Sequence, residues 1–396
     1  MSGILIIGGG IAGTAAALAL HKAGFEATVH EAYPHGAEDI GAFLTLADNG
    51  MRALAQLDAA EAVADTGFPL TAMRVIDAAG AEVAAVPLGD PASPLTSYRC
   101  LLRSELNRVL QAEARRRGIV VRHSARLVGL AEDADGVTAS FADGSSAEGS
   151  LLIGADGLNS TVRTLLHPGG PEPRYAGQRV FYGYSPGARP EDATERITMI
   201  RSDTAAFGYA VSPKDETFWF ARVSGGPASA AELAAGTVAQ WRGELVSRLR
   251  RDDTPAADIV AATGDRLMLT NACDLPVGTP WHTPTGRALI IGDAAHAASP
   301  ATGQGASMAL EDAVVLAKAL RDLPSTTAAL AAYQRHRRPR VEQNITTSAR
   351  ITAGAAPAPA AAPPGPPQQR DSANPVSRVQ EQLVRQLDWD TTLLSC

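Results

Sequence analysis

The spacing of apolar residues in the first thirty positions predicts a strand, a turn, a helix and a second strand. Ile4–Ile7 is a short apolar run that leads directly into Gly8-Gly9-Gly10-Ile11-Ala12-Gly13. Apolar residues then recur at the spacing of one helix face, at Ile11, Ala15, Leu18 and Ala19. Gly24 is expected to end this helix, and residues 27–31 form the next strand.

Further along the chain, the pattern predicts more helices and short strands, and then a strand-rich aromatic region. Helices are expected at 49–64 and Ser104–Arg117, and strands at 71–88 (two, around Ala79-Gly80), Val120–Leu130, Val137–Phe141 and Leu151–Ile153. Between 171 and 280, aromatic residues concentrate in alternating short strands, with one helix near 229–250. A strand at 288–291 and a long helix at 304–320 follow.

The last part of the sequence changes character. Residues 353–368 are rich in alanine and proline and predict an extended linker. Asn374-Pro375 is a plausible helix start, and an apolar stripe follows it at Val376, Val379, Leu383 and Leu387. This terminal helix is expected to dock on the body of the protein or to pair with another chain.

Composition narrows the class of protein. Of the 396 residues, 45% are apolar and only 19% are charged. This apolar fraction is enough to build a sizeable buried core. The net charge of −7 disfavours nucleic acid as a partner, and three separated cysteines predict neither a disulfide framework nor a metal cluster. No apolar run reaches the roughly 20 residues of a membrane span, and no basic leader precedes Ile4. We therefore expect a soluble cytoplasmic protein without a membrane partner.

The glycine turn after the first strand carries the first candidate chemistry. Gly8 permits a tight turn, Gly10 lets the backbone approach a pyrophosphate, and Gly13 lets the helix pack closely on the strand. The helix N-terminus adds free N–H groups for an anion. Glu31 ends the second strand, where a carboxylate can accept a hydrogen bond from a ribose hydroxyl. This arrangement predicts a dinucleotide site; the alternative is a purely structural turn with a solvated acid beside it.

A second glycine-rich segment favours a flavin as the dinucleotide. Asp293 follows the strand at 288–291, where it can accept hydrogen bonds from a ribityl chain. Pro300 and Gly303-Gln304-Gly305 precede the long helix, and glycine lets its first N–H groups approach a planar ring. The positive end of that helix would stabilise negative charge on a reduced flavin. A third turn, Gly154-Ala155-Asp156-Gly157, follows the strand at Leu151–Ile153.

Taken in order, these segments resemble the FAD-dependent aromatic hydroxylases of the p-hydroxybenzoate hydroxylase-like class, the single-component class A flavoprotein monooxygenases. The matching segments are GGGIAG, GADG-x-x-S-x-VR, and GDAAH-x-x-x-P-x-x-GQG-x-x-x-x-x-ED. Arg103 in LLRSELNRVL matches an arginine of the family that contacts FAD. The resemblance covers residues 1–345 in outline. Ala47-Asp48-Asn49 and Ser307 depart from the family's usual residues.

The resemblance implies an α/β fold with two domains. A Rossmann-like FAD-binding domain with a doubly wound, mostly parallel sheet is expected from 1–70, 98–170 and 281–345. A second α+β domain on a mixed sheet would bind substrate with 71–97 and 171–280, followed by a linker at 353–370 and a C-terminal helix at 371–396. The residues expected to hold FAD are Gly8, Gly10, Gly13, Glu31, Arg103, Asp156, Asp293, Pro300, Gly303 and Gly305. Asp156 and Arg163 belong to a segment linked to both FAD and transient NAD(P)H binding.

The activity that the resemblance implies is monooxygenation. NAD(P)H would reduce FAD, and the reduced flavin would react with O₂ to form a C4a-hydroperoxide. This species would hydroxylate or epoxidise an aromatic or polycyclic small molecule, in natural-product tailoring or aromatic catabolism, in a monomer or homodimer. Three alternatives stay open: a flavin dehydrogenase or oxidase without oxygen transfer, an antibiotic-inactivating monooxygenase, and a non-catalytic flavin- or ligand-binding protein. The sequence shows no second Rossmann motif for the nicotinamide, and no catalytic residue is assigned.

Candidate substrate contacts lie in the aromatic region. Its rings could line a pocket for a flat molecule or form the core of the second domain. The candidates are Tyr184, Tyr209, Phe220 and Arg222, and the arginine or a tyrosine would orient a phenolate. His296 is interpreted as structural, and Arg335-His336-Arg337-Arg338 as a solvated helix face.

Overall fold

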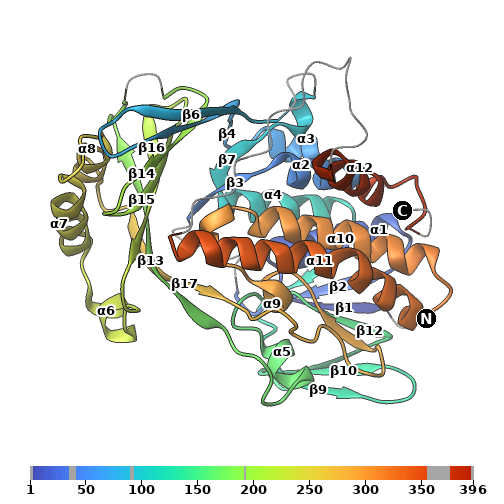
Figure 1. The fold of residues 1–396 in the computed structure, drawn as a ribbon. Helices are drawn as coiled ribbons and strands as arrows, with labels where there is room; N and C mark the ends of the chain where they lie inside the picture. The colour runs from blue at the N-terminus through green and yellow to red at the C-terminus, as the bar shows by residue number, and fades with distance from the viewer. Residues whose placement is uncertain (1–2, 35–41, 90–92, 191–192, 355–374, 394–396) are drawn as a thin grey trace.

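The computed structural model describes residues 3–34, 42–89, 93–190, 193–354 and 375–393, and it shows a mixed α/β fold (Figure 1). A five-stranded sheet has the order β18-β12-β1-β2-β8. Its strands are β1 (Ile4–Ile7), β2 (Ala27–His30), β8 (Val120–Arg122), β12 (Leu151–Gly154) and β18 (Ala288–Ile290). All pair in parallel, so their carboxyl ends share one edge. The chain winds outward from β1 in both directions, which makes the β1–β12 boundary the topological switch point.

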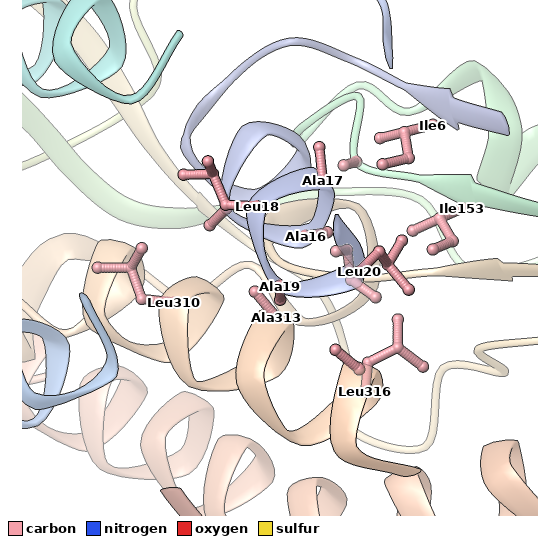
Figure 2. Close-up of a cluster of buried hydrophobic side chains, with 14 of the residues drawn as sticks. Ile6, Ala16, Ala17, Leu18, Ala19, Leu20, Ile153, Leu310, Ala313 and Leu316 are labelled. Atoms are coloured by element: carbon pink, nitrogen blue, oxygen red, sulfur yellow. The ribbon is translucent and has the colours of Figure 1, made fainter. Parts of the chain in front are cut away.

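Two buried helices cover one face of this sheet. Helix α1 (Ile11–Lys22) lies between the strands and α10 (Gly305–Asp322), and its residues from Gly13 to Leu20 are all buried. Figure 2 shows alanines of α1 close to Ala313 of α10, where small side chains allow the helices to approach. Because α1 is apolar all round, it is stable only inside the core. The predicted strand, turn, helix and second strand are confirmed.

Three predicted elements are wrong in length because the chain turns inside them. The predicted helix 49–64 is two helices, α2 (Asp48–Gln56) and α3 (Ala60–Ala64), separated near Asp58, which has φ 54°. The predicted strand Val120–Leu130 is also two: Ser124, with φ 60°, separates β8 from β9 (Leu127–Glu132). The helix near 229–250 divides at Gly236. Left-handed backbone at non-glycine residues gives little signal in a single sequence.

The remaining helices and strands of this part of the fold surround the parallel sheet. Strands β9, β10 (Val137–Phe141) and β11 (Ser146–Gly149) form a separate antiparallel sheet near α5 (Thr161–Leu166). Helix α4 (Arg103–Arg116) packs on α1, and α11 (Thr326–Thr352) runs along α10 (Figure 1). A short helix, α9 (Asp293–His296), follows β18 directly.

A seven-stranded mixed sheet has the order β17-β13-β16-β15-β14-β5-β6. Its strands are β5 (Ala72–Ile76), β6 (Glu82–Pro87), β13 (Arg174–Pro186), β14 (Arg196–Arg201), β15 (Ala206–Val211), β16 (Glu216–Ser224) and β17 (Leu267–Asp274). One face packs on α7 (Val238–Leu249) and α8 (Ala256–Ala261), while α6 (Ala230–Ala235) precedes α7. The other face packs on a small antiparallel sheet of β3 (Phe43–Leu46), β7 (Arg99–Leu102) and β4 (Phe68–Pro69).

The C-terminal helix α12 (Pro375–Leu387) docks on the body, against α10 and α2. Leu383 and Leu387 are buried as predicted, but Val379 is 56% exposed, so the apolar stripe is only partly confirmed. Most of the predicted linker, together with Asn374, lies outside the described residues. Within the described ranges, no helix is both long and apolar enough to cross a bilayer.

Lys318 anchors this terminal segment. Its ammonium group is fully buried on α10 and donates to the carbonyl oxygens of Arg385, Gln386 and Asp388. The Thr391 hydroxyl lies 3.4 Å from the same nitrogen. The first two carbonyls belong to the last turn of α12 and the third to the residue that follows the helix, where helix C-termini carry unsatisfied oxygens and attract cations.

Candidate cofactor and substrate site

Gly8, Gly10 and Gly13 lie at the carboxyl edge of the parallel sheet, next to the switch point. Gly8 has φ 104°, and a Cβ there would lie 2.5 Å from the Ala155 carbonyl oxygen. A Cβ at Gly13 would overlap the carbonyl oxygen of Gly8. At Gly10, by contrast, no heavy atom lies within 4 Å of the Cβ position. The first and third glycines are therefore required by the fold, whereas the second borders open space.

Glu31 holds this turn against the end of β2. Its Oε2 accepts a 2.6 Å hydrogen bond from the Gly9 N–H, and its Oε1 accepts one of 2.9 Å from Tyr33 N–H. The Gln111 side chain donates to the Gly9 carbonyl oxygen at 2.7 Å. Sequence reasoning placed Glu31 here but missed the bond to Gly9. A carboxylate has further lone pairs, so a ribose hydroxyl remains a compatible partner.

The second turn brings Asp293 close to Gly305, two residues after Gly303. Asp293 is exposed at the start of α9, and its Oδ1 lies 3.9 Å from the Cβ position of Gly305, the first residue of α10. Gly303 is left-handed, with φ 65°, and ends the single 3₁₀ turn that begins at the exposed Pro300. The N-terminus of α10 has no side-chain cap. Free N–H groups and a carboxylate thus border the same space.

Glycine also brings the two turns together. Gly292, with φ 58°, precedes Asp293, and a Cβ there would lie 2.8 Å from Cβ of Ala12 on α1. The start of α1 and the start of α9 are therefore neighbours. This contact places Gly10 and Asp293 on adjoining parts of one edge, as the sequence predicts for a single extended ligand.

The third turn is largely occupied by its own contacts. Asp156 accepts a 2.5 Å hydrogen bond from the Ser160 hydroxyl and one of 3.0 Å from Val162 N–H, at the start of α5. Arg163 is buried and donates to the carbonyl oxygens of Leu158 and Ala294. This arginine therefore fastens α5 to α9, next to Asp293. Arg103 differs, because its side chain is exposed at the N-terminus of α4.

A buried ionic network supports the Asp293 and Gly305 turns from behind. Arg337 is fully buried on α11, with Nε 2.8 Å from Asp312 Oδ1 and Nη1 bonded to Glu311. Asp312 Oδ2 accepts from Gly292 N–H at 3.0 Å and from His296 Nε2 at 2.5 Å. The interpretation of 335–338 as a solvated face is therefore wrong at Arg337, which faces the core. Charged residues alone did not show which side of a long helix was buried.

Opposing effects set the ionisation of these carboxyls. Burial alone would raise the pKa of Asp312, but the charges of His296 and Arg337 outweigh it and lower the pKa to about 2. For Glu311 burial is likewise outweighed, by Arg337, Arg340 and Asn49, and its pKa falls. Asn49 also donates to the Gln304 side chain at 3.1 Å. Both carboxyls are thus ionised at neutral pH, and the network ties α2, α9, α10 and α11 together.

The aromatic candidates divide between the two faces of the seven-stranded sheet. Tyr184 and Phe220 lie on the face toward β3, and Arg222 shares it by strand alternation. Tyr209 lies on the opposite face, in the core with α7 and α8. The structure therefore brings three of the four candidates together but not Tyr209. Sequence alone identified the strands but not the face of each one.

Strand β3 links this aromatic face to the glycine turn. The Phe43 ring lies between 5.7 and 6.4 Å from the rings of Tyr182, Tyr184, Phe218 and Phe220. Thr45 faces the same side two residues later, and its hydroxyl oxygen lies 3.2 Å from the Cβ position of Gly303. Sequence analysis assigned no role to Phe43 or Thr45. The aromatic surface and the Gly303 turn are therefore separated by about one strand repeat, roughly 7 Å.

The groups at this edge fit FAD. Space at Gly10 and the start of α1 suit a pyrophosphate, Glu31 suits a ribose, and Asp293 suits a polyol. The Cβ-free Gly303 and Gly305 and the uncapped start of α10 suit a planar ring that gains negative charge.

Comparison with known proteins gives the same result. A family model described as an FAD-binding domain matches residues 1–348. Aurachin C monooxygenase/isomerase of Stigmatella aurantiaca is 31% identical over 88% of this chain and 88% of its own length. The 3-amino-4-hydroxybenzoate 2-monooxygenase PtmB3 of Streptomyces platensis is 33% identical, with 86% and 85% covered.

A solved structure shows the same fold with its cofactor. Klebsiella pneumoniae HpxO in complex with FAD and uric acid superimposes with a TM-score of 0.77, at 27% identity, over 98% of this chain and 93% of that one. The match spans both the parallel sheet and the seven-stranded sheet. The chain therefore belongs to the FAD-binding family of flavoprotein monooxygenases and hydroxylases, with FAD as its cofactor.

Proposed function

We propose that this protein is an NAD(P)H-dependent monooxygenase that inserts one oxygen atom from O₂ into an aromatic or heterocyclic small molecule. The observation that carries the proposal is the position of β3, whose Phe43 enters the aromatic face while Thr45 borders Gly303. A planar substrate on that face would lie beside a ring held at the glycine turn. The names of the relatives, an aurachin C monooxygenase and an aminohydroxybenzoate monooxygenase, support an aromatic substrate.

The proposed FAD contacts follow the course of the edge. Gly8, Gly10 and Gly13 would receive the pyrophosphate at the start of α1, and Glu31 would bind the adenosine ribose. Asp293 would bind the ribityl chain, while Pro300, Gly303 and Gly305 would border the ring. Arg103, exposed at the start of α4, is free to reach the cofactor. Asp156 is proposed to act through its cap on α5. Once bound, FAD supplies hydride acceptance and oxygen activation.

The chain's own residues would position the substrate and exclude water. Phe220 is partly exposed and offers a flat apolar surface. Tyr184 is buried beside it, with the guanidinium carbon of Arg266 4.1 Å from its ring centroid, and would support that surface. The substrate unit would be 71–97 and 171–280, which contribute the seven-stranded sheet. The cofactor unit would be 1–70, 98–170 and 281–345. Tyr209, on the far face, would support this surface without touching the substrate.

The experiment that tests the proposal is turnover under ¹⁸O₂. The purified protein is mixed with NADH or NADPH and a panel of aromatic and heterocyclic compounds, and nicotinamide oxidation is followed at 340 nm. We expect one compound class to stimulate oxidation and to gain a single labelled oxygen. Oxidised product without label would show a dehydrogenase or oxidase. No stimulation by any compound, with FAD bound, would favour a binding protein instead.

A further inference from the structure

The side chain of Arg222 is buried without a partner for most of its donors. It is 5% exposed, and its Nε and Nη1 atoms have no hydrogen bond to the described residues. The nearest aromatic ring, that of Phe220, lies 5.9 Å from the guanidinium carbon, at the outer limit of a cation–π contact. Such a group is costly to bury, because an arginine keeps its charge at neutral pH.

Other buried arginines of the described chain show what is missing. Arg99 donates to the Thr66 carbonyl oxygen, Arg163 to two carbonyl oxygens, and Arg337 to two carboxylates. In each case these hydrogen bonds compensate the cost of burying the guanidinium group. Arg222 has no such bond from Nε or Nη1 among the described residues. Its burial must therefore be compensated by a group that the described residues do not supply.

The position of Arg222 shows where that missing partner would lie. The residue is on β16, paired with Val180 of β13 and Ala206 of β15, on the face that carries Tyr182 and Phe220. Burial raises the pKa of the Tyr182 phenol, whereas the charges of Arg222 and Arg103 lower it, which places both cations near this ring. Arg103 starts α4 in the cofactor part of the site. The part of the aromatic face around Tyr182 thus carries positive charge.

We propose that the substrate carries an anionic oxygen group, a carboxylate on a planar ring, and that Arg222 binds this group. The inference rests on the proposed function, because it takes the aromatic face as the substrate surface. The guanidinium donors form charge-assisted hydrogen bonds to such oxygens, and stacking on Phe220 and Tyr182 fixes the plane of the ring. Binding then removes the cost of an unpaired buried charge, so acids are preferred over neutral molecules of the same shape.

Matched pairs of an acid and its amide test the proposal. The FAD-loaded protein is titrated by calorimetry, without NAD(P)H, with 4-hydroxybenzoate and 4-hydroxybenzamide, anthranilate and anthranilamide, and 2-naphthoate and 2-naphthamide. In the wild type we expect at least one acid to bind tenfold or more tightly than its amide. Arg222→Gln should abolish that preference, and Arg222→Lys should restore part of it. Arg201→Gln is the matched control and should keep the preference, because Arg201 is an exposed arginine on β14, which β15 separates from β16 in the same sheet.

FAD also carries negative charge and could be the partner of Arg222 in place of the substrate. The affinity of the Arg222→Gln variant for FAD distinguishes these two roles. A substrate role predicts that the FAD dissociation constant of Arg222→Gln stays within twofold of the wild type. Loss of FAD by this variant would overturn the proposal and assign the arginine to the cofactor. Equal binding of acids and amides by the wild type, or an unchanged preference in Arg222→Gln, would also overturn it. Because binding is measured without turnover, these results are independent of the ¹⁸O₂ experiment that tests monooxygenation.

Discussion

Arg337 on α11 and Asp312 on α10 form a fully buried ion pair, with Nε 2.8 Å from Oδ1. The other oxygen of Asp312 holds Gly292 N–H, one residue before Asp293. A side chain far along the sequence thus fixes the backbone at the proposed ribityl contact. The attraction within this ion pair adds little net stability. Removing one partner is costly because it leaves an unbalanced charge in the core.

Arg337→Met should destabilise the protein by about 3–5 kcal/mol, because Glu311 and Asp312 would stay buried with less compensation. The free energy of unfolding in urea measures the effect. Arg335→Met is the matched control, since Arg335 is exposed on the same helix, and it should cost less than about 0.5 kcal/mol. Adding Glu311→Gln and Asp312→Asn to Arg337→Met should recover part of the loss. A single variant as stable as wild type would contradict this account.

Two glycine-to-alanine variants should separate fold from cofactor binding. Gly13→Ala should destabilise the protein by about 3 kcal/mol or more, since the new Cβ overlaps the Gly8 carbonyl. Gly10→Ala should leave stability nearly unchanged, because its Cβ meets no atom and its φ of −75° suits alanine. Its FAD affinity should nevertheless fall at least tenfold, about 1.4 kcal/mol. Fluorescence titration with FAD and urea unfolding give the two readouts. If Gly10→Ala bound FAD as tightly as wild type, the proposed position of the pyrophosphate beside Gly10 would be wrong.

Asp293→Ala should weaken FAD binding by about 1–3 kcal/mol, the range for loss of a hydrogen-bond partner in a buried complex. The exposed side chain carries little of the fold, so thermal unfolding of the FAD-free protein should change little. Asp135→Ala, in an exposed turn, provides the control. If Asp293→Ala retained FAD as tightly as that control, the ribityl contact would have to be reassigned.

His30 should make stability depend on pH between about 4 and 6.5. Burial, aided by Arg122, lowers its pKa from 6.5 to about 4, and the ring stacks on Phe141 at 4.7 Å. Below pH 6.5 the unfolded chain takes up a proton here while the folded chain stays neutral, so stability falls as the pH drops through this window. The loss should be about 1–3 kcal/mol.

Replacing this histidine supplies the check. His30→Met should flatten the pH dependence of unfolding between pH 4.5 and 7.5, whereas His21→Asn, at an exposed position, should leave it as in wild type. Both variants are compared by urea denaturation at the two pH values. An unaltered slope in His30→Met would show that other groups are responsible.

The glycine turns at the carboxyl edge of the parallel sheet could be predicted because their signals are local. Gly8, Gly13 and Gly303 stand where neighbouring backbone leaves no room for a side chain or where φ is positive, and such constraints leave glycines at fixed spacing. Strand and helix periodicity supplied the rest of the doubly wound sheet. These features involve residues a few positions apart, which a single sequence can show.

What the sequence could not show depends on contacts between distant segments. Tyr209 and Phe220 are both aromatic residues on strands and look alike in the sequence. In the structure they lie on opposite faces of the sheet. In the sequence, Arg337 is one member of a charged run. Only the structure shows that it binds two carboxylates of α10. The role of Phe43 needed the pairing of β3 with β7 and its packing on a sheet formed much later in the chain.

The anchoring of Lys318 has a consequence for biosynthesis. Helix α10 begins at Gly305, and near its other end the ammonium group of Lys318 donates to the carbonyl oxygens of residues 385, 386 and 388. A nascent polypeptide that has not yet emerged from the ribosome to that point leaves this ammonium in water. Closure of the far end of α10 therefore requires that residues 385–388 have already been synthesised.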